Sequence, residues 1–404
     1  MQINQTKIKE TEAGSIPSDW KIVDLKSLTS VITKGTTPTT GGGHFTDTGI
    51  NFVKVESITE DGNIVYNKLA HIDSKTNEDL GRSKFQLEDI LYTIAGTIGR
   101  VAKVSQELLP ANTNQAVAII RADKNKIDID YLKYYLNSSA IKEYKKSKII
   151  QCAQPNLSLG DIGQMPIVIP RIDEQKSIVS VLNNLDKKIE LNRRINQTLE
   201  AIGETIFKNE FIGLVMKGWK EASLDSVATF LNGLPLQKFP SESEDYLPVI
   251  KIRELKSGVT DSTDRASCNI DPKYIIEDGD ILFSWSGSLE VVLWAGGKGA
   301  LNQHLFKVTS ESYPKWFYYY WLKYYLPMFK RIAAGKATTM GHIQRHHLTS
   351  SIVFVPDEKK MNELDNLLSP IVELVINNLT EIRRLSQIRD SLLPKLMSGK
   401  VRVR

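Results

Sequence analysis

Three histidines in the last quarter of the chain have a spacing that could suit metal binding. His342, His346 and His347 would place two imidazoles on one face of a helix, and imidazole is a common zinc ligand. A complete site needs further ligands, but no carboxylate or cysteine lies nearby in the sequence. We therefore expect these histidines to contact phosphate groups or to be exposed, rather than to hold a metal.

Two glycine-rich segments could in principle bind phosphate. They are residues 41–44 (GGGH) and 296–299 (GGKG), and neither opens an obvious helix. The sequence also lacks the Gly-x-x-x-x-Gly-Lys-Ser/Thr pattern that binds the phosphates of nucleoside triphosphates such as ATP. We interpret both segments as flexible loops and predict no ATP-driven activity.

Aromatic residues gather in residues 316–321 (WFYYYW), and Tyr131, Tyr134 and Tyr135 match them weakly in the first half. Such side chains could stack on nucleic-acid bases. Their position on a predicted helix in both halves favours the domain core instead.

The composition is that of an ordinary globular protein. The chain has 404 residues, 41% hydrophobic and 25% charged, with a net charge of +5. This length predicts at least two domains, and the charge permits nucleic-acid binding without requiring it. Cys152 and Cys268 are isolated in the sequence, which favours a reducing compartment over a disulfide framework. The polar N-terminus has no signal-peptide pattern, and the most apolar segment, residues 316–329, is too short to span a bilayer. We therefore expect a cytoplasmic protein without a membrane partner.

The chain repeats itself over nearly its full length. Trp20-Lys21 recurs as Trp219-Lys220, and residues 88–92 (EDILY) recur as 279–283 (GDILF). Asn114-Gln115 recurs as Asn302-Gln303, and residues 167–170 (IVIP) recur as 353–356 (VFVP). The offset falls smoothly from 199 to 186 residues, as differences in loop length would make it.

Both repeats predict the same order of elements, a series of strands followed by a helix and a last strand. The strands of the first repeat are predicted at 50–55, 90–94, 100–104, 116–120 and 167–169, with a helix from about Tyr131 capped by Asp130. Those of the second are predicted at 248–252, 281–285, 291–294, 305–308 and 352–355, with a helix that starts near Pro314. Each repeat is therefore a mixed α/β domain.

A long helix with a coiled-coil seam is predicted after each repeat. The seam residues of the first are Ile178, Leu182, Leu185, Ile189 and Asn192. Those of the second are Leu364, Leu368, Ile371, Val375 and Asn378, each 186 residues after its equivalent in the first. The two asparagines are either buried in the seam, where they would fix its register, or exposed at a local phase slip.

The two helices can hide their apolar seams against each other. An antiparallel pair would place the two domains at opposite ends, related by a pseudo-twofold axis. The first helix, from about Asp173 to Asn209, would be roughly 55 Å long, which matches roughly 16 base pairs of B-DNA. Two domains held by such helices could read a split, gapped DNA site.

These helices closely resemble the conserved regions of the specificity subunits of type I restriction–modification systems. Residues 169–176 (IPRIDEQK), 185–189 (LDKKI) and 192–196 (NRRIN) are similar to the family's central region. Residues 392–403 (LLPKLMSGKVRV) are similar to its terminal signature. The second copy departs from the first, with residues 357–360 (DEKK) in place of the Glu-Gln pair, which leaves open how alike the two docking surfaces are.

The resemblance implies a domain order and a set of partners. We expect target-recognition domain 1 in residues 1–172, a central helix in 173–210, target-recognition domain 2 in 211–356 and a C-terminal helix in 357–404. Two methyltransferase subunits would dock on the helices and bind S-adenosylmethionine, restriction subunits would join for cleavage, and each domain would read half of a bipartite site in double-stranded DNA. This chain would bind no cofactor itself.

Two other functions are weighed against this one. A self-contained methylation or restriction enzyme is disfavoured, because the chain has neither a glycine-rich cofactor loop after a strand nor an Asn-Pro-Pro-aromatic motif. A coiled-coil adapter with two protein-binding heads and no DNA role would share the same architecture. We therefore predict a specificity subunit without catalytic residues.

Candidate DNA-binding residues are the polar and basic side chains of the predicted loops. In the first domain they are Lys34, Thr36, Thr37, Lys54, Asn112, Asn114, Gln115, Gln154 and Asn156. In the second they are Lys251, Arg253, Gln303, His304, Lys336, Thr338, Thr339, His342 and Arg345. The side chain of Gln115 could bind an adenine edge through two hydrogen bonds. The recurrence of Asn-Gln in domains that read different half-sites favours a turn-forming or phosphate-binding role for that pair.

Overall fold

The computed structural model describes residues 8–11, 14–149, 155–212, 218–241, 243–335 and 341–403. The chain divides into two compact units. Unit 1 consists of residues 1–185 and 388–404, and unit 2 of residues 186–387. The helices α5 (Ile172–Phe211) and α10 (Glu358–Met397) each contribute residues to both units. The predicted domain boundaries, which set the helices apart as separate segments, stay a prediction.

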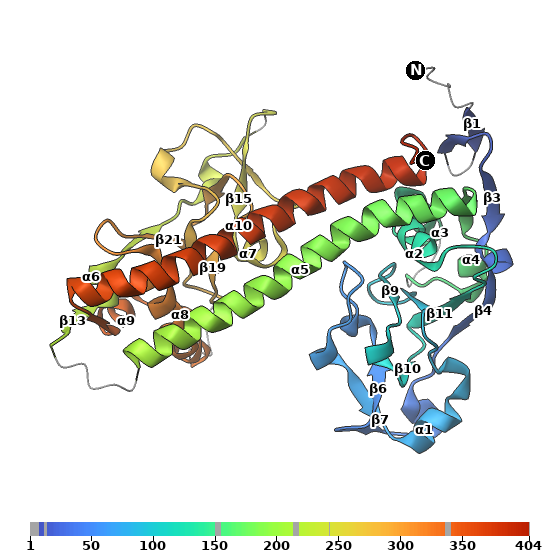
Figure 1. Ribbon diagram of the computed structural model, residues 1–404, viewed down its shortest axis with the longest axis horizontal. Helices are drawn as coiled ribbons and strands as arrows, with labels where there is room; N and C mark the ends of the chain where they lie inside the picture. Colours follow the sequence, from blue (N-terminus) through green and yellow to red (C-terminus); the bar gives the residue numbers. More distant parts are fainter. Residues whose placement is uncertain are drawn as a thin grey trace. The chain divides into compact units, whose positions relative to one another are not determined.

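The described part of unit 1 contains two four-stranded sheets and several short helices (Figure 1). Its strands are β1 (Ile8–Thr11), β2 (Gly14–Pro17), β3 (Lys21–Asp24), β4 (Thr29–Lys34), β5 (Phe45–Thr46), β6 (Ile50–Val53), β7 (Ala70–Ile72), β8 (Ile90–Thr93), β9 (Val101–Lys103), β10 (Ala111–Thr113), β11 (Val117–Ala122) and β12 (Pro166–Ile169). Its α-helices, besides its parts of α5 and α10, are α1 (Ser74–Asp79), α2 (Ile129–Leu136), α3 (Ser139–Ile149) and α4 (Leu159–Gly163). One sheet is antiparallel in the order β4-β11-β8-β9, and the other has the order β10-β6-β7-β5 with β6 and β10 parallel.

Unit 2 has matching sheets in its described part. Its strands are β13 (Lys220–Ser223), β14 (Thr229–Asn232), β15 (Leu247–Ile250), β16 (Arg265–Ala266), β17 (Ile275–Ile276), β18 (Ile281–Ser284), β19 (Val291–Leu293), β20 (Gly299–Leu301), β21 (Leu305–Thr309) and β22 (Ile352–Val355). Its own helices are α6 (Leu224–Val227), α7 (Ile252–Ser257), α8 (Lys315–Ala334) and α9 (Arg345–Thr349). The sheet β14-β21-β18-β19 corresponds to β4-β11-β8-β9, and parallel β15 and β20 correspond to β6 and β10. The predicted duplication and mixed α/β class are confirmed.

Strand periodicity explains how the central strands join two cores. Along β8, Ile90 and Tyr92 belong to the larger apolar cluster of unit 1, whereas Leu91 points into the cluster between the sheets. In unit 2, Ile281 and Phe283 belong to one cluster and Leu282 to another. Successive side chains of a strand face opposite sides, so both faces of these strands are buried.

The predicted strands are confirmed to within two residues at each end. The first predicted helix begins earlier than expected: α2 starts at Ile129, and its N-cap is Asp128, whose carboxylate accepts a hydrogen bond from the backbone N–H of Tyr131 at 3.0 Å. Asp130 is instead in the first turn and forms an ion pair with Lys103. The prediction of Asp130 as the cap is therefore wrong, because the N-cap lies two residues earlier, at Asp128.

The aromatic run of α8 belongs to the core. Residues 316–321 are all at most 5% exposed, and they pack with Phe207 and Phe211 of α5. Tyr131, Tyr134 and Tyr135 are buried in unit 1 in the same way. These side chains are thus unavailable for stacking on bases. Along the described stretches, none of the helices has the length and apolar character needed to cross a membrane.

Within unit 2, α5 and α10 run antiparallel (Figure 1). The Asn192 side chain donates a hydrogen bond from Nδ2 to Oε2 of Glu381 at 2.7 Å. Further along α5, Glu210 pairs with Lys360, which lies near the start of α10, at 3.0 Å. Residue numbers therefore rise along α5 in the direction in which they fall along α10.

Both asparagines of the predicted seam are buried, but they do not bind each other. Asn192 is 0% exposed and Asn378 is 9% exposed. Asn378 donates from Nδ2 to Oδ1 of Asn196 at 2.8 Å, and Asn196 donates in turn to the backbone oxygen of Val375 at 3.1 Å. The Oδ1 atom of Asn192 is buried without a hydrogen-bond partner in the described part of the chain.

The apolar seam residues are distributed between the two units. Ile178 and Leu182 pack in unit 1 with Leu396, and Leu364 and Leu368 pack in unit 2. The remaining apolar seam positions are buried at Ile189 and Val375, and half-buried at Leu185 and Ile371.

Candidate nucleic-acid interface

The repeated Asn-Gln pair follows the strand β10 in unit 1 and β20 in unit 2. Asn114 accepts a hydrogen bond at Oδ1 from the backbone N–H of Ala116 at 3.0 Å. Asn302 accepts one in the same way from the backbone N–H of His304 at 3.2 Å. Each asparagine therefore holds a turn, as expected of a side chain that bonds the backbone two residues ahead.

A glycine that the sequence analysis missed lies against this turn in each unit. A Cβ atom at Gly35 would lie 1.8 Å from the backbone oxygen of Thr113, and one at Gly233 would lie 2.3 Å from that of Asn302. No other residue fits without moving the backbone. Gly35 directly follows β4 and Gly233 directly follows β14, the equivalent strands of the two units.

The glutamines of the two pairs have different surroundings. In unit 1, the hydroxyl of Thr37 donates to Oε1 of Gln115 at 2.5 Å. In unit 2, Pro235 occupies the position two residues after the equivalent glycine, so no hydroxyl is available there. The Oε1 atom of Gln303 is buried and has no hydrogen-bond partner among the residues described.

Four of the predicted residues of unit 2 line one cavity of about 300 Å³. The lining consists of Gln237, Lys251, Ile252, Arg253, Asn302, Gln303 and His304. His304 is oriented by a contact of 2.9 Å between its Nδ1 atom and the hydroxyl of Ser286. The cavity thus combines amide, imidazole and cationic groups, which are the types that bind base edges and phosphates.

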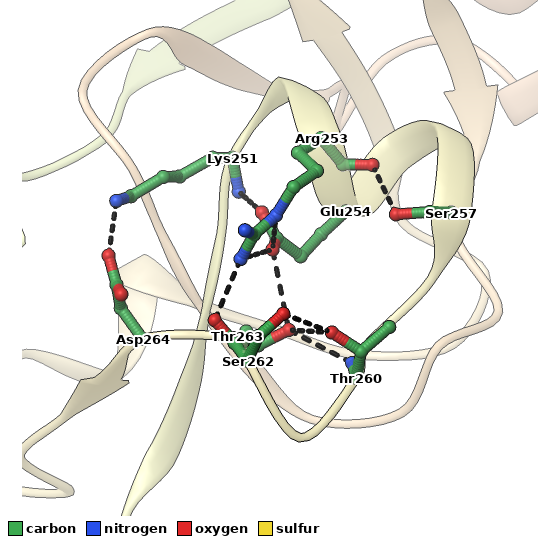
Figure 2. A network of polar contacts seen from close by, with 8 residues as sticks. All are labelled: Lys251, Arg253, Glu254, Ser257, Thr260, Ser262, Thr263 and Asp264. Atoms are coloured by element: carbon green, nitrogen blue, oxygen red, sulfur yellow. Dashed lines mark hydrogen bonds and ion pairs between the residues drawn. The ribbon is translucent and has the colours of Figure 1, made fainter. Parts of the chain in front are cut away.

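One wall of this cavity is fixed by a buried carboxylate (Figure 2). Glu254 is 1% exposed and accepts hydrogen bonds from the backbone N–H of Lys251 at 3.1 Å and from Nε of Arg253 at 2.8 Å. The hydroxyl of Thr263 donates to the same carboxylate at 3.3 Å. Glu254 was not among the residues predicted from the sequence, although its place three residues after Lys251 is that of a capping-box glutamate.

The two cations of this wall have partners within the network of Figure 2. Arg253 also donates from Nη2 to the backbone oxygen of Ser262 at 2.9 Å. Lys251 binds Asp264, and this hydrogen bond holds the pKa of the Asp264 carboxyl below its usual value. Lys251 and Arg253 are therefore oriented before any ligand arrives, and part of their charge is already balanced.

The predicted residues of unit 1 are brought together less completely. Thr36 accepts a hydrogen bond from Arg82 at 3.3 Å, and the ammonium of Lys54 lies 4.5 Å from the ring centre of Phe45. Lys34 is half-buried. Asn156 is exposed and forms an isolated bridge to Ala95.

The structure argues against one residue of this group. Asn112 is 0% exposed, and its amide donates to Oδ1 of Asn77 at 2.9 Å and to the backbone oxygen of Leu80 at 3.3 Å. Its side chain cannot reach a base, so the prediction that it contacts DNA is wrong. Four other predicted residues lie outside the described ranges: Gln154, Lys336, Thr338 and Thr339.

The histidines and Arg345 lie around α9. The rings of His346 and His347 are 3.9 Å apart, and His342 lies beside Trp285. Within the described ranges, no group of three or more His, Cys, Asp or Glu residues could hold a metal ion. Arg345 is exposed at the first residue of α9.

Comparisons with known proteins agree on one family. A family model described as "Type I restriction modification DNA specificity domain" matches residues 17–201 and again residues 216–384. The type I restriction enzyme MjaIX specificity subunit of Methanocaldococcus jannaschii is 24% identical over 99% of this chain and 97% of its own. The EcoKI specificity subunit of Escherichia coli K12 is 22% identical over 96% of this chain and 90% of its own. A crystal structure of the type I restriction–modification S subunit from M. genitalium has a similar fold, with a TM-score of 0.50, 17% identity and 98% coverage of both chains.

Proposed function

Because this chain belongs to the family of type I restriction modification DNA specificity domains, we propose that each of its two units reads one half of a bipartite, gapped site in double-stranded DNA. The observation that carries this proposal is the Asn-Gln turn. Both units build the turn on the same backbone, with a glycine beneath it, yet the glutamine side chains have different partners. A shared scaffold whose glutamines have different surroundings suits two readers of different base sequences.

The long helices α5 and α10 serve as the docking surface for two methyltransferase subunits. Ile202 and Ile388 are 186 residues apart, at equivalent positions of the repeat, and they are 44% and 46% exposed. Leu191 and Leu367 add exposed apolar surface to the same two helices. Equivalent exposed isoleucines in the two units support the docking of two copies of one partner.

The same helices set the gap between the half-sites. Each has 40 residues, which corresponds to a length of about 60 Å, or roughly 18 base pairs of B-DNA. This chain supplies sequence reading and spacing without catalytic residues. The partner methyltransferases bind S-adenosylmethionine, and restriction subunits join them for cleavage.

The test is to express the chain with its methyltransferase subunits and to map the methylated bases in genomic DNA. We expect a split motif with a fixed gap, and no methylation by this chain alone. Methylation by the isolated chain, or a motif without two halves, would contradict the proposal.

A variant of Arg345 assigns one half of the motif to unit 2. Arg345→Ala is expected to weaken binding by about 1–3 kcal/mol and to relax the preference in one half-site only. Lys220→Ala removes an exposed cation of the same unit from β13 and serves as the control. Equal affinity of the Arg345 variant and the original chain for every site would exclude Arg345 from the interface.

A further inference from the structure

We propose that Gln303 reads an adenine in the half-site of unit 2, whereas Gln115, its counterpart in unit 1, presents its N–H donors and favours hydrogen-bond acceptors. This inference rests on the proposed function, since it assumes that both units bind base edges. It assigns different chemistry to two residues that are identical in type and equivalent in position.

The chemistry follows from the two ends of the amide. In the major groove adenine presents the N6 amino group, which donates, beside N7, which accepts, and a glutamine pairs with both through Oε1 and Nε2. Such recognition is favoured where no donor within the protein already holds Oε1. Gln303 meets this condition within the described chain, because its Oε1 has no hydrogen-bond partner.

The backbone of Gln303 is already fixed. Its N–H donates to the backbone oxygen of Leu234 at 3.0 Å, and it lies within the turn that Asn302 holds. The side chain is half-buried at the cavity whose lining includes Lys251 and Arg253. The terminal torsion of a glutamine is soft, so the amide can turn toward a base that enters. A base amino group would then satisfy the buried oxygen.

Gln115 differs because its oxygen already has a donor. The Thr37 hydroxyl donates to Oε1, holds one of its two lone pairs and fixes the amide with that oxygen toward Thr37. With Oε1 held in this way, the N–H groups of Nε2 are better placed to meet a base, and they match the acceptors of guanine, O6 and N7, rather than the N6 amino group of adenine. The two glutamines differ because of the residue two positions after the turn glycine of each unit. This residue is Thr37 after Gly35 in unit 1 and Pro235 after Gly233 in unit 2.

The test uses the full chain with its methyltransferase subunits and a library of duplexes randomised at every position of the motif. For the original complex, we expect an adenine at one position of the half-site that Arg345→Ala relaxes. Gln303→Ala should abolish the preference at that position and weaken binding of the best site by about 10- to 100-fold. Gln303→Glu keeps the size and the acceptor but loses the donor, and it should favour cytosine there, because a carboxylate accepts from the N4 amino group.

A change in unit 1 gives the reciprocal experiment. Thr37→Val has nearly the same shape as threonine but lacks the hydroxyl, so it releases Oε1 of Gln115. One position of the other half-site should then accept adenine about as well as guanine, while the half-site of unit 2 stays unchanged. This variant leaves the core of unit 2 untouched and therefore tests the idea even if substitutions at Gln303 impair folding.

The outcomes separate this inference from the function on which it rests. An original complex without a split motif removes the DNA-reading function itself. A split motif that is unchanged base by base in Gln303→Glu and Thr37→Val overturns the assignment of the glutamines and leaves the function standing. A folded Gln303→Ala complex with unaltered preference would do the same.

Discussion

The hydrogen bond between Asn378 and Asn196 predicts an unusual pattern of stabilities. Asn378→Leu would leave the buried Oδ1 of Asn196 without its donor, and Asn196→Leu would leave the Nδ2 of Asn378 without its acceptor. Each single variant should therefore lower the free energy of unfolding of unit 2 by about 1–3 kcal/mol, the typical penalty of an orphaned buried polar group. The double variant leaves neither orphan and has a continuous apolar seam, so it should be more stable than either single variant.

The assay is urea unfolding of the full chain and the three variants, followed by the helical signal of circular dichroism. We expect a coupling free energy of about 2 kcal/mol or more between the two positions. The double variant should therefore lose less stability than the sum of the two single losses, by at least that amount. Asn192→Leu is the matched control: its bonded partner, Glu381, keeps 44% of its side-chain exposure and can return to water, so this change should cost little. Additive losses, with the double variant the least stable of the set, would refute the reasoning.

Other predictions concern unit 1 and the packing of α5. Arg402 donates to both oxygens of Glu174, which is 6% exposed, and to Asp19. Arg402→Ala should therefore destabilise unit 1 by about 2 kcal/mol, measured by thermal unfolding, because it leaves the Glu174 carboxylate buried without its partner. Arg402→Lys keeps the charge and should cost less. The hydrogen bond from Arg402 lowers the pKa of the Asp19 carboxyl below 3.8. The ion pair between Arg402 and Asp19 therefore stabilises unit 1 fully above that pH, and its contribution is lost as the pH falls through the lowered pKa. The stability of Arg402→Ala, measured against pH, should lack this acid loss. Gly203→Ala should destabilise unit 2 by about 1–3 kcal/mol, because its Cβ would lie 1.8 Å from the buried hydroxyl of Tyr320, and a lowered urea midpoint would show it.

The repeat and the long helices could be predicted from the sequence because their signals are local and periodic. The heptad spacing of Leu364 and Leu368 and the buried strand at residues 90–94 are of this kind. The strands of the second sheet in each unit were mostly missed. β16 and β17 have two residues each, which is too short for a period of two to be recognised.

The candidate site was predicted only in part, because its properties depend on residues that are distant in the sequence. The bond between Thr37 and Gln115 spans 78 residues, and the burial of Asn112 follows from contacts with Asn77 and Leu80. The turn held by Asn114 could be predicted, since its bond reaches only two residues ahead. Local side-chain chemistry is therefore readable from sequence, whereas the availability of a side chain for a ligand is not.

The division of the chain has a consequence for its synthesis. Unit 1 includes residues 388–404, and Arg402 bonds to Glu174 and Asp19 across 228 and 383 residues. The first domain emerges from the ribosome long before this last segment, and roughly 200 further residues take roughly 10–40 s to synthesise. During that interval the apolar cluster of unit 1 lacks Leu396 and Met397. A chain truncated shortly before residue 388 should therefore leave unit 1 incomplete, open to proteases and chaperones, even though every strand of its sheets is present.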